Sequence, residues 1–195
     1  MNSSATEAPD DQMLLNQIGE GSEPAMESFY KRHSDAVYRF AYKTLQNPVD
    51  AAEVMNEVML TVWQKPFTFK GKSKVTTWLY GITHNKAVDA VRKNARHDHV
   101  GEFDPEQAEH SQSENDDACE LFEAQQGLEN ASYVKTCMDK LSNSHRQVVY
   151  LTFFEGLSYP EIANVVAVPA GTVKTRMMHA KQLLLKCLQR LLGSE

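Results

Sequence analysis

The sequence predicts an all-α protein of two small helical domains joined by an acidic, flexible linker, with a helix-turn-helix in the C-terminal domain. Apolar residues recur at helical spacing in both halves of the 195-residue chain, and no convincing strand pattern occurs. Residues 97–132 hold eleven Asp and Glu and no Lys or Arg. Such a block cannot bury enough apolar surface to fold alone. We therefore expect domains at 10–96 and 133–192 and a linker at 97–132.

The charge distribution indicates what the two domains bind. The whole chain has a net charge of −6, yet residues 65–96 carry eight Lys and Arg against one Asp. Residues 171–190 carry five Lys and Arg and no acid. Two basic surfaces on either side of an acidic tether are typical of a chain that binds nucleic acid at two places.

The first domain is expected to hold three helices after a disordered polar stretch at 1–10. The first helix ends at Asn47-Pro48, a pair that breaks helices. The second begins at Asp50 with Glu53 as its capping-box partner. The expected ranges are 26–45, 50–64 and 75–92.

The second domain is expected to hold four helices. Gly156 fits the stop of one helix, and Ser158 and Glu161 form a capping box at the start of the next. A tight turn, AVPAG, then leads into a longer helix with a basic outer face, which describes a helix-turn-helix. The expected ranges are 134–141, 145–155, 159–166 and about 171–191, and a short helix is expected at 119–126 within the linker.

Other features of the sequence limit which class of protein this chain can belong to. Cys119, Cys137 and Cys187 stand far apart without a CxxC pair, so we expect reduced thiols. The histidines near the acidic block show no regular ligand spacing, so the sequence predicts no metal and no cofactor. No apolar run reaches the roughly 18–20 residues that a membrane span needs, and the N-terminus lacks the features of a signal peptide. We expect a soluble cytoplasmic protein without direct membrane insertion.

The last helix is the clearest candidate for DNA contact. In the major groove, Arg can bond guanine edges, Thr can bond bases or phosphates, and Lys neutralises phosphates. A merely solvated face is the alternative, and the capped helix and turn before it favour DNA. The candidate residues are Thr172, Lys174, Thr175, Arg176, His179 and Lys181.

Two long stretches resemble one family. "LSNSHRQVVYLTFFEGLSYPEIANVVAVPAGTVKTRMMHAKQLL" resembles the −35-reading domain of bacterial sigma factors of the extracytoplasmic-function group. "DAAEVMNEVMLTVW" followed by "FKGKSKVTTWLYGITHNKAVDAVRK" resembles that family's other domain, which binds core RNA polymerase and opens the −10 element. Both halves occur in the family's order over about residues 10–192. The resemblance is to sigma-70 factors of the extracytoplasmic-function type (group 4).

The resemblance implies that the helix starting near Asp50 docks on the coiled coil of the polymerase's largest subunit. Acids at i, i+3 and i+7 lie on one side of a helix and could pair with basic residues there, while apolar side chains anchor. An internal core is the alternative for the valines. The candidate residues are Asp50, Glu53, Val54, Glu57, Val58 and Trp63.

The resemblance also implies that the loop and helix after residue 66 capture and melt the −10 element. Lysines follow the DNA backbone, and aromatic faces stack on unpaired bases at about 1–3 kcal/mol each. Trp78 also fits an internal core position. The candidate residues are Phe69, Lys70, Lys72, Ser73, Lys74, Trp78, Tyr80, His84, Asn85, Lys86, Arg92 and Lys93.

Four positions depart from the family's pattern. Ala52 stands where an acid is common, which would weaken the polymerase contact. Thr76 and His84 stand where Arg is frequent, so two phosphate contacts would be lost or, at His84, depend on pH. Gly81 within a helix costs roughly 1 kcal/mol relative to Ala, and nothing in the sequence explains it.

As the resemblance implies, the protein carries out no chemistry. It would bind core RNA polymerase through the coiled coil and the flap, direct it to promoter DNA, and be restrained by an anti-sigma factor, which could hold it at the inner membrane. In the family the acidic linker threads through polymerase channels near the RNA path, and here it would either imitate RNA phosphates or act as a plain spacer.

Two rival classes remain at the level of sequence. A one-component helix-turn-helix regulator would bind duplex DNA without polymerase, and it predicts an upstream ligand or receiver domain that the basic aromatic loop argues against. An enzyme with a DNA-binding tail lacks any Gly-rich phosphate loop, HExxH or nucleophile elbow in this sequence.

Overall fold

The computed structural model describes residues 10–97 and 128–192. All regular structure in these two ranges is helical, so the all-α prediction is confirmed. The expected linker, apart from its edges, the short helix at 119–126 and nearly all of the stretch 1–10 lie outside the described residues. We call residues 10–97 the N-terminal unit and residues 128–192 the C-terminal unit.

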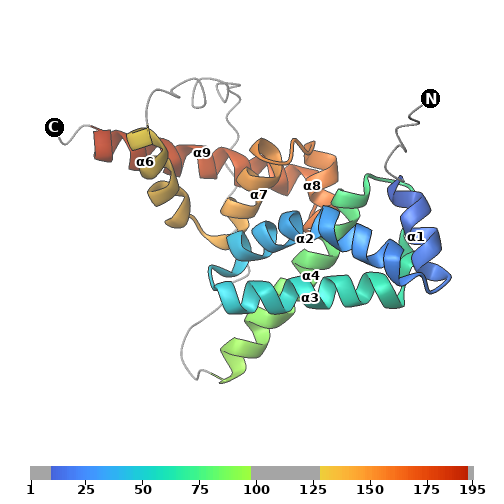
Figure 1. Cartoon of the computed structure of the whole chain (residues 1–195). Coiled ribbons are helices and arrows are strands. Elements are labelled where there is room, and N and C mark those ends of the chain that lie inside the picture. The colour runs from blue at the N-terminus through green and yellow to red at the C-terminus, as the bar shows by residue number, and fades with distance from the viewer. Residues whose placement is uncertain (1–9, 98–127, 193–195) are drawn as a thin grey trace, which may run out of the picture.

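The N-terminal unit packs its helices around α2, which contacts α1, α3 and α4 (Figure 1). Its apolar core includes Phe29, Val37, Val58 and Leu79, each at most 1% exposed. The elements are α1 (Asp11–Gly19), α2 (Glu23–Leu45), α3 (Pro48–Gln64), the 3-10 turn η1 (Pro66–Thr68) and α4 (Val75–His97).

Helix α1 was not predicted from the sequence. Its side chains Leu14, Leu15 and Ile18 are buried in the core of the N-terminal unit. Their spacing (i, i+1, i+4) fits a helix, but nine residues offer too few apolar positions for a periodic pattern.

Helix α3 begins at Pro48, two residues before the predicted start, so the capping box of Asp50 and Glu53 is wrong. The Oδ1 atom of Asn47 accepts hydrogen bonds from the backbone N–H groups of Val49 (2.9 Å) and Asp50 (3.3 Å). Asn is a strong N-cap, and proline in the first turn lacks only an N–H that would have no partner there.

The C-terminal unit contains the predicted helix-turn-helix, formed by α8, a turn and α9. The Oε2 atom of Glu161 accepts hydrogen bonds from Ser158 N (2.9 Å) and Ser158 Oγ (2.7 Å), which confirms the capping box. Gly156 has a φ of 64°, as expected for a glycine after a helix. The elements are α6 (Leu128–Asp139), α7 (Asn143–Phe153), α8 (Tyr159–Val165) and α9 (Ala170–Leu192).

A disulfide joins Cys137 of α6 to Cys187 of α9. The prediction of reduced thiols is therefore wrong for these two cysteines. They are 50 residues apart in sequence, with no CxxC pattern, and only the crossing of α6 over α9 brings them together (Figure 1).

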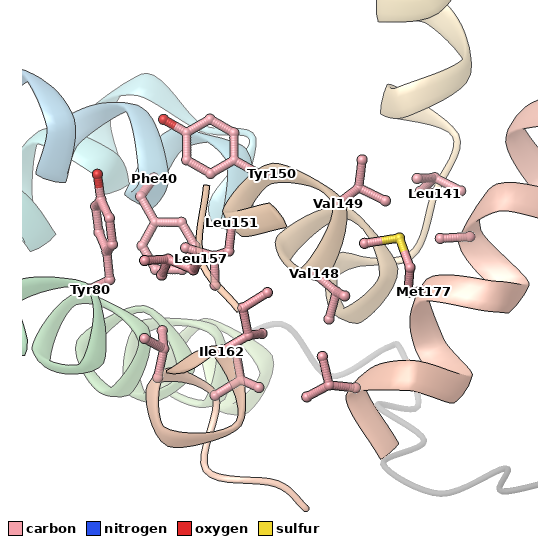
Figure 2. Packing of buried hydrophobic residues seen from close by; sticks show 14 of the residues in the cluster. Phe40, Tyr80, Leu141, Val148, Val149, Tyr150, Leu151, Leu157, Ile162 and Met177 are labelled. Atoms are coloured by element: carbon pink, nitrogen blue, oxygen red, sulfur yellow. The ribbon is translucent and has the colours of Figure 1, made fainter. Parts of the chain in front are cut away.

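The two units pack against each other. Helix α2 lies along α7, and α4 lies against α8. Phe40 of α2 and Tyr80 of α4 enter the apolar cluster of the C-terminal unit, beside Leu151 and Leu157 (Figure 2). The sequence predicted two domains but gave no indication of this contact.

Candidate nucleic-acid interface

The proposed polymerase residues divide between surface and core. Glu53 and Glu57 are exposed on α3 and Asp50 is half-buried. Val54 and Val58 are 3% and 0% exposed and belong to the core of the N-terminal unit. Trp63 is half-buried against that core. An incoming partner therefore meets the acids first, and the two valines hold the helix in place.

Glu57 and Lys86 form an ion pair between α3 and α4. Glu57 Oε2 lies 3.0 Å from Lys86 Nζ, and both side chains remain partly exposed. A candidate polymerase contact is thus bonded to a candidate −10 contact. The two surfaces adjoin.

The loop before α4 presents its cations to solvent. Lys70, Lys72, Ser73 and Lys74 are all exposed. The loop borders an open hollow of about 490 Å³, whose lining includes Phe69, Ser73, Lys74 and Thr76 and also the acids Asp10 and Asp11. Thr76, one of the four departures, therefore lies where a larger Arg would narrow this hollow.

Two aromatic residues among the −10 candidates pack against each other beside the loop. The rings of Phe69 and Trp78 lie with their centroids 5.4 Å apart, and both are half-buried against the core of the N-terminal unit. In this state each offers only part of its ring to a base.

Tyr80 is 1% exposed and faces the C-terminal unit. Its hydroxyl donates a hydrogen bond of 2.5 Å to Glu155 Oε2. Burial and this bond raise the pKa of Tyr80 above its ordinary value of 10.0. Tyr80 reaches a base only if the two units separate.

The remaining −10 candidates follow the length of α4. His84 and Lys86 are half-buried, while Asn85, Arg92 and Lys93 are exposed. Burial, followed by the nearby charge of Arg176, lowers the pKa of His84, and a hydrogen bond with Gln147 acts in the opposite direction. The Nδ1 atom of His84 is buried without a hydrogen-bond partner.

The −35 candidates lie on α9 and are mostly half-buried. Only Lys174 is exposed, and Thr175 Oγ1 donates to its own helix at Gly171 O (3.0 Å). The ring of His179 lies 6.2 Å from that of His145 of α7. Half-buried in the same way are Thr172, Thr175, Arg176, His179 and Lys181.

Arg176 lies near the surface predicted to contact the −10 element. Burial lowers its pKa, and its charge in turn lowers the pKa values of His84 and His145, for both of which burial is the larger cause. Similarly, Lys74 is close enough to Glu161 for its charge to contribute, after the bonds with Ser158, to lowering the pKa of that carboxyl. The structure brings the two predicted DNA surfaces together at one boundary.

Sequence reasoning missed the residues that form this boundary. Gln147 Nε2 donates to Thr44 Oγ1 (3.1 Å), and Arg146 Nη1 donates to the carbonyl oxygen of Lys43 (3.1 Å). The only feature of the sequence that hinted at these contacts is a polar pair, Arg146-Gln147, within an apolar helix.

Neither a metal-binding cluster nor a membrane-spanning helix occurs within the described residues. No group of three or more His, Cys, Asp or Glu within the described part of the chain could hold a metal ion. No helix there has the length and apolar character to cross a membrane.

A helix-turn-helix with a basic reader helix, joined in one chain to a helical unit with a basic aromatic loop, defines a DNA-binding protein with two reading surfaces. Family models match both parts: "Sigma-70 region 2" matches residues 29–97, and "Sigma-70, region 4" matches residues 132–184. The chain belongs to the sigma-70 family of transcription initiation factors, and within it to the extracytoplasmic-function (ECF) type.

Relatives cover nearly the whole chain. The ECF RNA polymerase sigma factor SigW of Bacillus subtilis (strain 168) is 27% identical over 181 residues, which are 91% of this chain and 96% of SigW. The RNA polymerase sigma-H factor of Pseudomonas aeruginosa is 27% identical over 186 residues, 93% of this chain and 95% of that protein.

Two solved structures share the fold. The sigma factor RpoE in complex with the anti-sigma factor NepR from Bartonella quintana superposes with a TM-score of 0.62, at 23% identity, over 84% of this chain and 96% of RpoE. CnrH in complex with the cytosolic domain of CnrY gives a TM-score of 0.61, at 24% identity, over 92% of this chain and 97% of CnrH. At these identities the likeness is one of fold.

Proposed function

We propose that the chain binds core RNA polymerase, directs it to specific promoters and helps to melt their −10 element. One observation carries the proposal: a basic reader helix in a helix-turn-helix and a basic loop backed by Phe69 and Trp78 lie on separate units of one chain. Reading two promoter elements requires two surfaces, and melting requires a place for an unpaired base. The protein itself performs no catalysis in this role.

The polymerase contact is assigned to the acidic side of α3. Asp50, Glu53 and Glu57 would meet basic residues on the coiled coil of the largest subunit, with Trp63 at the edge. Val54 and Val58 would act by keeping the helix packed. The C-terminal unit would contact the flap.

The DNA contacts are assigned to the two basic surfaces. The exposed loop lysines and α4 would hold the −10 strand, with the hollow beside Phe69 as the place for a base. The N-terminal half of α9, above all Arg176, would read the −35 element in the major groove. The domain limits are placed at 10–96 and 133–192, with residues 97–132 as the linker.

An anti-sigma factor is proposed as the restraint on this chain. The support is that two structures with the same fold, RpoE and CnrH, are bound to anti-sigma proteins. A factor that works on RNA polymerase acts in the cytoplasm and on the nucleoid. If its anti-sigma partner is a membrane protein, the restrained form would be held at the inner membrane.

The test is gel filtration of the full chain with core RNA polymerase, with and without a competing housekeeping sigma factor. We expect stable co-elution that the competitor removes, and promoter-dependent transcription by the reconstituted enzyme. Binding to duplex DNA alone, without binding to core, would instead favour the one-component regulator.

A further inference from the structure

The disulfide of the C-terminal unit has one sheltered half and one half near solvent. Cys137 of α6 is 1% exposed, whereas Cys187 of α9 is only half-buried. A thiol that exchanges with a disulfide must reach one of its two sulfur atoms, so access decides which sulfur is attacked. An incoming thiol therefore meets this bond from the side of Cys187.

Cys187 lines a hollow of about 220 Å³ toward the C-terminal end of α9. Within the described residues, Cys137 takes no part in this lining, and the other lining side chains are apolar or cationic. They are Lys140, which follows α6, and Leu183, Lys186, Arg190 and Leu191 of α9. A small molecule in this hollow would lie beside the disulfide and be surrounded by positive charge.

The charges of the hollow indicate what kind of molecule it takes. Three cations line it, and no acid of the described part of the chain does. Positive charge attracts anions, and it favours the thiolate form of a thiol, which is the form that attacks a disulfide. Leu183 and Leu191 offer apolar contact for the stem of such a molecule. The lining therefore suits a small thiol that carries carboxylates, such as glutathione.

We propose that the hollow beside Cys187 is a site of exchange between the protein disulfide and a small anionic thiol. The thiolate attacks Cys187 Sγ, and its electron pair forms the new S–S bond. The old bond breaks with its electron pair on Cys137 Sγ, which takes up a proton. The product is a mixed disulfide between Cys187 and the small thiol.

A second small thiol completes the reaction. Its thiolate attacks the sulfur of the bound thiol, and Cys187 Sγ leaves and takes up a proton. In sum, the protein disulfide is reduced to two thiols, and two small thiols are oxidised to their own disulfide. The reverse reaction, which starts from that small disulfide, rebuilds the protein bond.

The exchange would set how firmly the C-terminal unit is held together. In the mixed disulfide and in the reduced chain, α6 is no longer tied covalently to α9. The ratio of the small thiol to its disulfide therefore decides what share of the molecules is tied. If the chain acts in the cytoplasm, as proposed above, it meets such thiols there. The site itself does not rest on that function.

The first test measures how fast the bond is reduced in the full chain with Cys119→Ser, in which Cys137 and Cys187 are the remaining cysteines. Glutathione serves as the anionic thiol and mercaptoethanol as the neutral one. The variant Lys140→Gln with Lys186→Gln removes two cations at exposed positions, so it should keep the fold. Each exposed pair of charges is worth about a factor of two, so we expect about fourfold slower reduction by glutathione. Reduction by mercaptoethanol should not change.

The matched control is Lys31→Gln with Lys65→Gln. It makes the same change in net charge at two exposed positions of the N-terminal unit, and both thiols should reduce it as fast as the parent chain. An equal loss of rate with glutathione in the two double variants would assign the effect to overall charge and overturn the site. Equal slowing of both thiols in Lys140→Gln with Lys186→Gln would overturn the preference for an anion.

The second test identifies the attacked sulfur. Peptide mapping of the oxidised parent chain should find the bond between Cys137 and Cys187, and its absence would overturn the site outright. The parent chain is then quenched with acid during reduction by glutathione. We expect mass mapping to place the trapped glutathione on Cys187, and an adduct on Cys137 would overturn the proposed direction of attack.

Single-cysteine chains check the same point from the reverse reaction. With glutathione disulfide, the Cys187 thiol in Cys137→Ser should form its mixed disulfide several-fold faster than the Cys137 thiol does in Cys187→Ser. Equal rates with helix content unchanged would contradict the difference in access. A chain that fails to bind core polymerase would still give these results, so the site and the proposed function can fail separately.

Discussion

The N-terminal and C-terminal units bury their apolar cores in different ways. The N-terminal unit has a core formed entirely by its own residues, and its loop lysines point freely into solvent. The core of the C-terminal unit includes Phe40 and Tyr80 from the other unit, and its reader helix is half-buried. The N-terminal unit therefore buries its apolar core with its own side chains, whereas the core of the C-terminal unit is completed by Phe40 and Tyr80 of the N-terminal unit.

The largest expected effect comes from two phenylalanines of α2, both 0% exposed. Phe29→Ala removes a ring from the self-contained core and should lower the free energy of unfolding of the N-terminal unit by about 3–5 kcal/mol. Phe40→Ala should instead speed hydrogen exchange in α7 and α8, with little change in α1 and α3. If both variants loosen the same helices, the two cores are not separate.

The next effect concerns the disulfide, which lies wholly within the C-terminal unit. Replacing Cys137 and Cys187 together by Ser should lower the stability of that unit by about 2–4 kcal/mol, because a closed loop of 50 residues constrains the unfolded chain. Thermal unfolding followed by exchange in α9 and in α3 checks this. Loss of protection in α3 would mean that the two units unfold together.

A third prediction separates the two DNA surfaces. Arg176→Ala should weaken recognition of the −35 element by about 1–3 kcal/mol without affecting polymerase binding. Lys72→Ala combined with Lys74→Ala should reduce opening of the −10 bases more than closed-complex formation. Footprinting with permanganate measures the opening. An unchanged footprint in the lysine variant would show that these lysines have no role in melting the −10 element.

The fourth prediction is a pH dependence of the contact between the two units. Burial, followed by the charge of Arg176 across the boundary, lowers the pKa of His84 from 6.5. A base whose pKa is depressed binds fewer protons in the packed state, so the contact is fully favoured above pH 6.5 and weakens as the pH falls below it. Energy transfer between fluorophores at two exposed positions, Asn56 of α3 and Gln189 of α9, should therefore decrease between pH 7 and pH 5.

Replacing His84 by Gln should flatten that pH profile. A profile that persists in this variant would assign the titration to other groups.

The smallest expected effect is at Gly81. A Cβ atom at this position would meet no atom within 4 Å beyond the local helix backbone and the two neighbouring residues, and the φ of Gly81 is not in the left-handed region. Gly81→Ala should therefore raise stability by about 1 kcal/mol through helix propensity alone. A measured loss of stability, from thermal unfolding of the full chain, would show that the glycine serves a need that packing does not reveal.

Periodicity and capping chemistry predicted most of the fold. Ser158 and Glu161 predicted the start of α8. Val173 and Met177 have the helical spacing of core residues in α9, and they are 0% and 1% exposed. Local signals were enough because each of these features depends on residues within a few turns of one another.

Apart from the missed helix α1 and the misplaced start of α3, the failures involve partners distant in sequence. Phe40 has the helical spacing of a core residue, but periodicity does not indicate which unit buries it. Tyr80 was predicted to contact DNA, and its hydrogen-bond partner Glu155 is 75 residues away in sequence. The same limit hid the disulfide. At the candidate site, the sequence predicted which charged side chains face outward on α3, but it could not separate Glu57 from the buried Val58 by role.

Because the chain is synthesised from its N-terminus, the two sides of the contact between the units are made at different times. Phe40 and Tyr80 leave the ribosome with the N-terminal unit, long before Leu157 is added. At about 5–20 residues per second, on the order of ten seconds pass between the synthesis of these two aromatic residues and that of the residues that bury them. In that interval the two rings lack the apolar cluster that buries them in the finished molecule. A newly made chain therefore exposes an apolar surface that the complete chain does not.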